Sequence, residues 1–319
     1  MVSNLKDLMA KFSDEQKCRD FLVQQRWGGN PSCPYCGSDK WYSIEGGKRF
    51  KCGNNACYKK YSVTVGSIFH ASNIPLTTWF PAMYIILSHK KGISSIQLAK
   101  DLGVTQKTAW FMLHRIRQGL KDKNSSLLGG TVEVDETYMS RKLASDYKGY
   151  TDEQIEEIMS NPNKAKQKGK GAVMGLAQRG GDVRITVYNE IDGKTAKQHI
   201  KDNVIPGSNV YTDSSSLYRT GLEEYSRESV NHSLVNPEWA RGDVHVNTIE
   251  SFWGMFKRGY YGIYHYMSFK HLQRYCDEFA YRRNTRQLKD GDRFELSLQR
   301  IDGKLPYKIL VHGNKEKSE

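Results

Sequence analysis

The sequence predicts an α/β protein in which a cysteine-rich module and a helical module precede a domain of strands and helices. Three observations predict this fold class. Four of the six cysteines fall between residues 31 and 70. Residues 76–122 carry apolar side chains at helical spacing. Residues 129–215 switch to β-branched strand patterns broken by glycine, and helical spacing returns over residues 245–286.

The composition fits a folded chain with a negatively charged partner. Its 319 residues suggest about two domains, and 38% hydrophobic with 11% aromatic residues exclude wholesale disorder. The net charge of +13 favours a polyanion, although a charge that only keeps the chain soluble is the alternative. No apolar run approaches the roughly 20 residues of a membrane span. Residues 1–17 lack the apolar core of a signal peptide, so we expect a cytosolic protein with no membrane partner.

Four cysteines predict a structural zinc site. They form two pairs, with two residues inside the first pair and four inside the second: Cys33, Cys36, Cys52 and Cys57. Zn²⁺ prefers four soft ligands in a tetrahedron, and a site closed by four thiolates is structural rather than catalytic. Gly37 and Gly53 each follow a cysteine where a tight turn needs glycine. Buried core thiols are the alternative, and this is our interpretation of Cys18 and Cys276, which lack partners at metal-binding spacing.

The helical region after the cysteines predicts a helix-turn-helix. Ser94 or Ser95 can cap a short helix, Gly103 supplies the turn, and Thr105 can cap a second helix. The second helix has an apolar side, expected inside, and a polar side, expected outside: Ala109, Met112, Leu113 and Ile116 against Gln106, Lys107, His114, Arg115 and Arg117. A plain three-helix bundle explains the apolar pattern nearly as well.

Three acidic residues stand in contexts that suit a metal site. Asp135 lies on a strand whose alternation puts it on the face opposite Val132 and Val134. Asp213 ends a second strand, and Glu250 lies on a helix that begins near residue 245. Each acid alone is weak evidence, and Glu133, Glu136 and Asp243 are nearby competitors.

The helix with Glu250 has two distinct faces. Its apolar residues recur at helical spacing and are expected to pack inward: Ile249, Phe252, Trp253 and Phe256. A second face carries Asn247, Glu250, Gly254 and Lys257. On that face Glu250 can reach a metal, and Lys257, two turns further on, can bind a phosphate beside it.

Carboxylates in such a set suit phosphoryl transfer. Mg²⁺ prefers hard oxygen ligands, and two ions about 3.5–4 Å apart can activate the attacking oxygen and stabilise the leaving one. Crowded carboxylates repel one another unless cations lie between them.

Several motifs together resemble one known family. The cysteine pairs are followed in order by VEVDETY, YTDSSSLY, HVNTIESFWGMFKRG and DEFAYRRNTR. In this order the motifs resemble the zinc-ribbon DDE transposases of bacterial insertion sequences, the ISXO2-like group related to the eukaryotic Merlin elements. The resemblance covers nearly the whole chain.

The resemblance implies a fold and an activity. It implies a ribonuclease-H-like catalytic core, a mixed sheet with flanking helices, with Asp135 on the first strand, Asp213 on the fourth and Glu250 on the following helix. It implies a DNA transposase that uses two Mg²⁺ (or Mn²⁺) ions, with Lys257 as the basic residue that follows the glutamate. Some relatives carry Asn as the third ligand, so Asn247 can share the role of Glu250.

The sequence thus gives a domain plan and a set of partners. The expected parts are a helical segment 1–30, a zinc ribbon 31–70, a helix-turn-helix region 71–125, a catalytic domain 126–290 with a basic insertion at about 141–171, and a C-terminal tail 291–319. Double-stranded DNA, as element inverted repeats and target, is the expected partner of a homodimer or larger assembly in the bacterial cytoplasm, at the nucleoid. The alternatives are a zinc-ribbon and helix-turn-helix transcriptional regulator, or a DNA nuclease of the same fold.

Overall fold

The computed structural model describes residues 2–122, 126–141, 151, 153, 170–231 and 238–312. The chain divides into two compact units, the first comprising Met1–Lys121 with Thr285–Glu319 and the second comprising Asp122–Asn284. Most of the basic insertion expected at about 141–171 lies outside the described residues. The domain limits expected from the sequence stay predictions.

Two short helices begin the first unit, and each is capped by a side chain just before it. In α1 (Leu5–Lys11) the cap is Asn4, and in α2 (Glu15–Trp27) it is Asp14. α2 ends at Gly28, whose φ of 59° is the left-handed conformation that glycine adopts without steric cost. The helix therefore ends where a residue free of side-chain strain allows the chain to turn.

The cysteine-rich segment folds into a small antiparallel sheet. Its strand order is β1 (Trp41–Ile44), β2 (Arg49–Cys52) and β3 (Lys60–Tyr61). The ring centroid of Phe50 lies 5.4 Å from that of Trp41, 5.6 Å from Tyr61 and 6.0 Å from Trp27 at the end of α2. A core of so few side chains gives little stability by itself, which is why such modules need a metal.

Helix α3 (Leu76–Ser88) is the buried centre of the first unit. Every residue from Trp79 to Leu87 is buried. The helices that pack against α3 are α1, α2, α4 (Ser95–Leu102), α5 (Gln106–Gly119) and α11 (Asp290–Leu298). The last helix, α12 (Tyr307–His312), reaches α5 through Tyr307, whose ring centroid lies 5.4 Å from that of Phe111.

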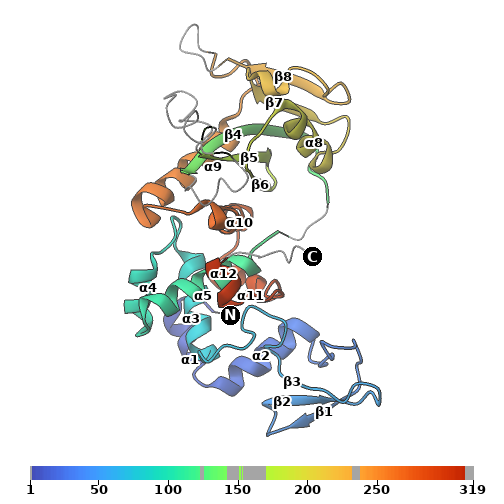
Figure 1. Cartoon of the computed structure of the whole chain (residues 1–319), viewed down its shortest axis with the longest axis vertical. Helices are drawn as coiled ribbons and strands as arrows, with labels where there is room; N and C mark the ends of the chain where they lie inside the picture. Colours follow the sequence, from blue (N-terminus) through green and yellow to red (C-terminus); the bar gives the residue numbers. More distant parts are fainter. Residues whose placement is uncertain are drawn as a thin grey trace. The chain divides into compact units, whose positions relative to one another are not determined.

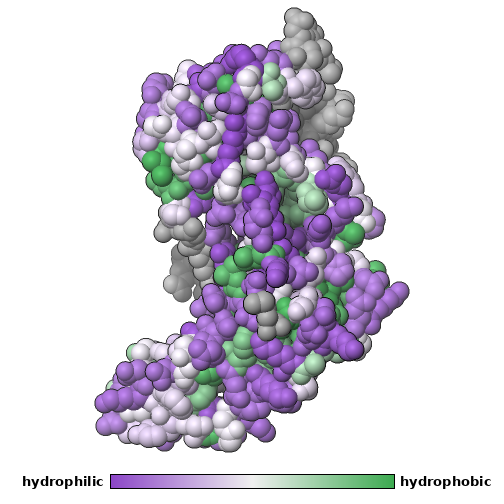
Figure 2. All heavy atoms as spheres, turned by 180° about the vertical axis from the view of Figure 1, so that it is seen from behind, coloured by the Kyte–Doolittle hydropathy of each residue, from purple (hydrophilic) through white to green (hydrophobic). Residues whose placement is uncertain are grey.

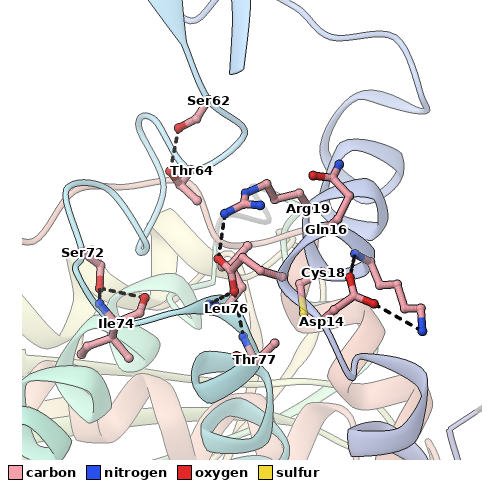
Figure 3. Close-up of polar contacts among 12 residues, drawn as sticks. Asp14, Gln16, Cys18, Arg19, Ser62, Thr64, Ser72, Ile74, Leu76 and Thr77 are labelled. Carbon is pink, nitrogen blue, oxygen red and sulfur yellow. Dashed lines mark hydrogen bonds and ion pairs between the residues drawn. The ribbon is translucent and has the colours of Figure 1, made fainter. Parts of the chain in front are cut away.

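The start of α3 is capped by a residue from α2. Pro75 precedes α3 and provides no side-chain cap. Instead, Glu15 Oε2 accepts hydrogen bonds from the amides of Leu76 at 2.8 Å and Thr77 at 3.4 Å, while Arg19 pairs with Glu15 Oε1 at 3.3 Å (Figure 3). A cavity of about 290 Å³ lies beside this contact, lined also by Arg19, Lys48 and Arg49. The carboxylate of Glu15 thus holds two helices together.

The expected turn between α4 and α5 is present, but three of the five residues expected on the outer face of α5 are buried. Ser94 caps α4, Gly103 ends it with a φ of 64°, and Thr105 caps α5. The inner residues Ala109, Met112, Leu113 and Ile116 are buried as expected. Gln106 and Lys107 are exposed, whereas His114, Arg115 and Arg117 are only 0%, 3% and 1% exposed.

The second half of α5 is buried because distant segments cover it. Arg115 donates a hydrogen bond to the carbonyl of His70, and its guanidinium lies 5.8 Å from the ring centroid of Trp79. A Cβ on Gly119 would lie 3.2 Å from Ile68 and 3.3 Å from the carbonyl of Arg300. Burial lowers the pKa of Arg115 to about 10. Only the start of α5 therefore has the exposure that base contacts require.

The second unit is built on a five-stranded mixed sheet (Figure 1). Its strand order is β6-β5-β4-β7-β8, from β4 (Thr131–Arg141), β5 (Lys170–Gln178), β6 (Val183–Tyr188), β7 (Asn209–Asp213) and β8 (Ser226–Val230). β5 is antiparallel to β4 and β6, whereas β7 is parallel to β4 and β8. This sheet confirms the mixed α/β architecture with flanking helices.

Helices cover both faces of the sheet. α8 (Gly193–Asn203) packs on the face that carries Val132 and Val134. α9 (Asn247–Gly259) and α10 (Phe269–Asn284) pack on the other face (Figure 1). The inward side of α9 is the expected one, with Ile249, Phe252, Trp253 and Phe256 all buried. A 3₁₀ turn, η2 (Ser216–Tyr218), follows β7, and a π-helical turn, η3 (Tyr260–Tyr264), follows α9.

The face seen in Figure 2 is mainly polar. Figure 2 shows hydrophilic residues over most of the face in view, with hydrophobic residues confined to small patches. Among the residues that the structure describes, no helix combines the length and the apolar character of a membrane span.

Candidate metal centre and active site

The four expected zinc ligands lie together in the first unit. Their sulfur atoms all fall within 4.8 Å of one another, with 3.9 Å between Cys33 and Cys57 and 3.6 Å between Cys36 and Cys52. The amide of Asn54 donates to Cys52 Sγ at 3.4 Å, as suits a thiolate. The spacing and the donor set fit Zn²⁺, and the four sulfur ligands leave no position for a substrate.

The two glycines after the cysteines serve different geometric needs. Gly37 has a φ of 73°, and its amide donates to the carbonyl of Cys33 at 2.8 Å. Gly53 has no positive φ, but a Cβ there would lie 3.0 Å from Cβ of Lys40 and 3.2 Å from its backbone. The first knuckle thus needs glycine for its turn, and the second needs it because two chain segments approach closely.

In the second unit, β4, β7 and α9 bring the three expected acids to one region. Thr212 of β7 pairs in parallel with Val134 of β4, so the next residues, Asp213 and Asp135, lie side by side on neighbouring strands. Glu250 lies in the first turn of α9, which packs over β4 and β5. The acids therefore come from three elements that are distant in the sequence.

The charges of these acids act on one another. Burial, followed by the negative charges of Glu136, Asp213 and Glu250, raises the pKa of Asp135 to about 7. Among the described residues, only the cysteine cluster has three or more potential ligand atoms all within 4.8 Å, so the carboxylates are more widely spaced. Oxygen donors that repel one another fit hard divalent cations placed between them.

Hydrogen bonds orient the carboxylates of the strand acids. The indole Nε1 of Trp253 donates to Asp135 Oδ2 at 3.0 Å, and the amide of Ser215 donates to Asp213 Oδ1 at 3.0 Å. Trp253 belongs to the same helix as Glu250, so one helix carries an acid and also holds the acid of the neighbouring strand. Sequence reasoning placed Trp253 inside but missed this bond, because a buried indole gives no signal of its partner.

A glycine makes room for that helix at the sheet. Gly175 of β5 pairs directly with Asp135. A Cβ at Gly175 would lie 2.6 Å from Ile249 and 2.7 Å from Trp253, closer than real Cβ contacts. The small residue lets α9 approach until its indole reaches Asp135.

Glu133 is a structural acid that fixes the start of α9. It is 0% exposed, and α9 has no side-chain cap of its own. Glu133 Oε2 accepts from the amides of Thr248 at 2.6 Å and Ile249 at 3.1 Å, and Oε1 accepts from Arg179 Nε at 2.8 Å. The carboxylate therefore satisfies helix N–H groups that would otherwise be buried without partners.

Arg179 joins the same network from the end of β5. It donates to the carbonyl of Asp243 at 2.7 Å and to His245 at its carbonyl and at Nδ1, 3.0 Å and 2.9 Å away. These contacts give His245 a structural place at the start of α9. Arg179 was missed by sequence reasoning, because its partners lie more than forty residues away.

The remaining expected residues occupy different environments. Asn247 and Lys257 are exposed on α9, on the face that also carries Glu250. The competitor Glu136 is mostly buried, accepts a hydrogen bond from the hydroxyl of Tyr218, and has its pKa raised chiefly by burial. The competitor Asp243 is exposed.

We expect Glu133→Gln to destabilise the protein by about 2–4 kcal/mol, because it leaves Arg179 without its buried anionic partner and weakens the cap of α9. Urea unfolding of the full chain measures this change. The control is Glu228→Gln, which removes an exposed pair with Arg241 at 3.1 Å and should cost less than about 1 kcal/mol. Equal urea midpoints for wild type and Glu133→Gln would contradict the assigned role.

Two segments of the chain match the domain models of known protein families. Residues 13–60 match the model of a transposase zinc-ribbon domain, and residues 127–284 match that of the ISXO2-like transposase domain. The chain is also 28% identical, over 253 residues, to a protein in the transposable element ISH50 of Halobacterium salinarum, with 75% of this chain and 81% of that protein covered. The matched domains are those of transposases. The chain belongs to the ISXO2-like family of insertion-sequence transposases.

Proposed function

We propose that this protein is a DNA transposase that cuts the ends of its element and joins them to target DNA. The observation that carries the proposal is the convergence of Asp135, Asp213 and Glu250 from β4, β7 and α9, with mutually interacting charges, inside the matched transposase domain. Such a set suits both steps, since hydrolysis of the strand and attack by its 3′-hydroxyl are displacements at phosphorus.

Each residue of the candidate active site has a proposed role. Asp135, Asp213 and Glu250 would hold two Mg²⁺ or Mn²⁺ ions, with Asn247 next to Glu250 as a further oxygen donor. When bound, such ions lower the pKa of the attacking water or 3′-hydroxyl and stabilise the leaving oxygen. Trp253 orients Asp135, and Glu133 sets the position of Glu250 by holding the first turn of α9. Lys257 would bind a phosphate of the DNA strand.

The first unit would supply DNA binding. The zinc ribbon carries five basic residues that suit phosphate contacts: Lys48, Arg49, Lys51, Lys59 and Lys60. If α4 and α5 act as a helix-turn-helix, base contacts fall to Gln106 and Lys107, since the start of a recognition helix reaches the bases and the later arginines of α5 are buried. We propose action as a homodimer or larger assembly on paired ends, at the bacterial nucleoid in the cytoplasm.

A cleavage assay tests the proposal. Purified full-length protein is incubated with Mg²⁺ and with DNA that carries the inverted repeats flanking its gene. We expect nicked ends, followed by joined products when target DNA is present. Binding without cleavage would support a transcriptional regulator instead, and cleavage without joining would support a nuclease of the same fold.

A further inference from the structure

We propose that Tyr261 and Lys257 form a binding site for an unpaired nucleotide of DNA, with the base stacked on the Tyr261 ring and its phosphate on Lys257. The site rests on the proposed function and adds a part to it: a binding site, further along the helix that carries Glu250, for a strand that has left the duplex. The residues lie at the end of α9 and in the π-helical turn η3 that continues it.

The position of Tyr261 follows from the helix that carries Glu250. At 3.6 residues per turn, positions i and i+7 of α9 lie on one face, and these are Glu250 and Lys257. Tyr261 follows Lys257 by four residues, about one turn, and lies near the same face. Tyr260, where η3 begins, still has right-handed helical angles of −58° and −55°. At 1.5 Å per residue, Tyr261 lies about 16 Å along the axis from Glu250. A strand held at the carboxylates can therefore continue over Lys257 to the ring.

The ring is presented to solvent. Tyr261 is 68% exposed, the following Gly262 is also exposed, and a Cβ added to Gly262 would meet nothing within 4 Å. Lys257 and Arg258, one turn earlier, are exposed as well. An aromatic ring beside two cations on an open surface favours a flat anionic ligand over an apolar protein segment.

The turn that carries the ring is firmly anchored. The hydroxyl of Tyr264 donates to Glu278 Oε1 at 2.7 Å, and its ring centroid lies 4.9 Å from that of Tyr275 in α10. The ring of Tyr260 meets Tyr261 edge-on, with centroids 5.1 Å apart and an angle of 83° between planes. The backbone that carries the ring is thus held in place before a ligand binds, so little backbone order has to be gained on binding. Single π-helical turns of this kind occur often at functional sites.

Stacking selects unpaired bases. In a duplex, each base face is covered by its neighbours, whereas a base in a single strand offers its face to an aromatic ring. The ring gains contact with any base, so recognition does not depend on sequence. The site would hold a displaced or frayed nucleotide of the strand that leads away from the cut end, about 16 Å along α9 from Glu250.

Binding of a single strand without Mg²⁺ tests this site. The probe is a fluorescein-labelled strand of ten thymidines, titrated with full-length protein at several salt concentrations. We expect Tyr261→Ala to weaken binding about tenfold at every salt concentration and Tyr261→Phe to restore it, since stacking needs the ring but not the hydroxyl. Lys257→Ala should instead make the slope of log K against log salt shallower by about 0.7.

Two controls separate stacking from general effects. Trp239→Ala removes a ring of similar exposure, 61%, from the segment before α9 and should leave the affinity within about twofold. Binding to a duplex of the same length should not change in Tyr261→Ala. Wild-type affinity of Tyr261→Ala for the thymidine strand, or an equal loss in Trp239→Ala, would overturn the proposal.

The outcome is distinguishable from that of the proposed function, because no metal or cleavage enters the binding assay. Cleavage and joining without Tyr261-dependent binding would reject this site and keep the transposase. Tyr261-dependent binding without any cleavage would keep the site and reject the transposase.

Discussion

Asp135→Asn is expected to abolish Mg²⁺-dependent DNA cleavage while DNA binding persists. An amide in place of the carboxylate removes a negative ligand from the centre of the candidate site. Since metal stabilisation of the displaced oxygens is worth several kcal/mol, and each 1.36 kcal/mol is tenfold in rate, the loss should be on the order of 10³-fold or more. Cleavage of end DNA and gel-shift binding of the same DNA measure the two quantities side by side.

The same substitution is expected to stabilise the metal-free protein at alkaline pH. The pKa of Asp135 is raised to about 7 from the ordinary 3.8, so between these values the folded state keeps a proton that the unfolded state has lost. Stability therefore falls as pH rises through this window, and the full penalty is present above about pH 7. Each pKa unit is worth about 1.4 kcal/mol. After relaxation of the neighbouring acids, we expect a gain of about 1–2 kcal/mol, or about 2–8 °C in Tm.

Melting curves at pH 8 and pH 4 separate this effect from a general one. The gain should be present at pH 8 and vanish at pH 4, and added Mg²⁺ should stabilise the wild type but not the variant. Asp243→Asn is the matched control, because Asp243 is an exposed acid just before α9. Cleavage at the wild-type rate by Asp135→Asn would show that the carboxylate set has been assigned wrongly.

Local patterns in the sequence predicted those features whose causes are local. The apolar residues of α9 recur at helical spacing, so its buried side could be predicted, and the cysteine spacing predicted the sulfur cluster. Gly103 ended α4 where expected, because a left-handed residue at this point is a requirement of the local chain.

The features that could not be predicted depend on partners distant in the sequence. Arg115 is polar and was expected outside, but its burial depends on His70 and Trp79. The role of Glu133 depends on Arg179 and on the first turn of α9, more than one hundred residues away. Periodicity in the sequence predicts which side of a helix is apolar. Only the tertiary fold determines which distant segments cover the remaining sides.

Two helix caps show how the chain joins its elements. α3 begins at Pro75 and α9 at Val246, and neither residue provides a side-chain cap. In each case a glutamate from another element takes that role: Glu15 of α2 for α3, and Glu133 of β4 for α9. An arginine then pairs with the glutamate, so the start of each helix is tied to a second element. In the second unit this cap sets where Glu250 stands relative to Asp135.

Loss of zinc is expected to unfold the cysteine-rich module and leave the second unit folded. Cys52 is 0% exposed and ends β2, where it packs with Phe50 and Tyr61. Because structural zinc supplies most of the folding free energy in modules of this size, about 10–16 kcal/mol in zinc-finger peptides, Cys52→Ser should lose both the metal and the fold of residues 33–61. Hydrogen exchange read by peptide should show lost protection there and unchanged protection in β4 and β5.

Cys18 provides the matched control for that prediction. It is also 0% exposed, but it lies in α2, and burial raises the pKa of its thiol to about 12, which opposes the thiolate that a metal needs. Cys18→Ala should therefore keep one zinc per chain by colorimetric release and keep protection in the ribbon. A full zinc equivalent in Cys52→Ser, or zinc loss in Cys18→Ala, would contradict the ligand set. DNA binding by Cys52→Ser should fall with the fold, because the basic residues of the ribbon then lose their fixed arrangement on its surface.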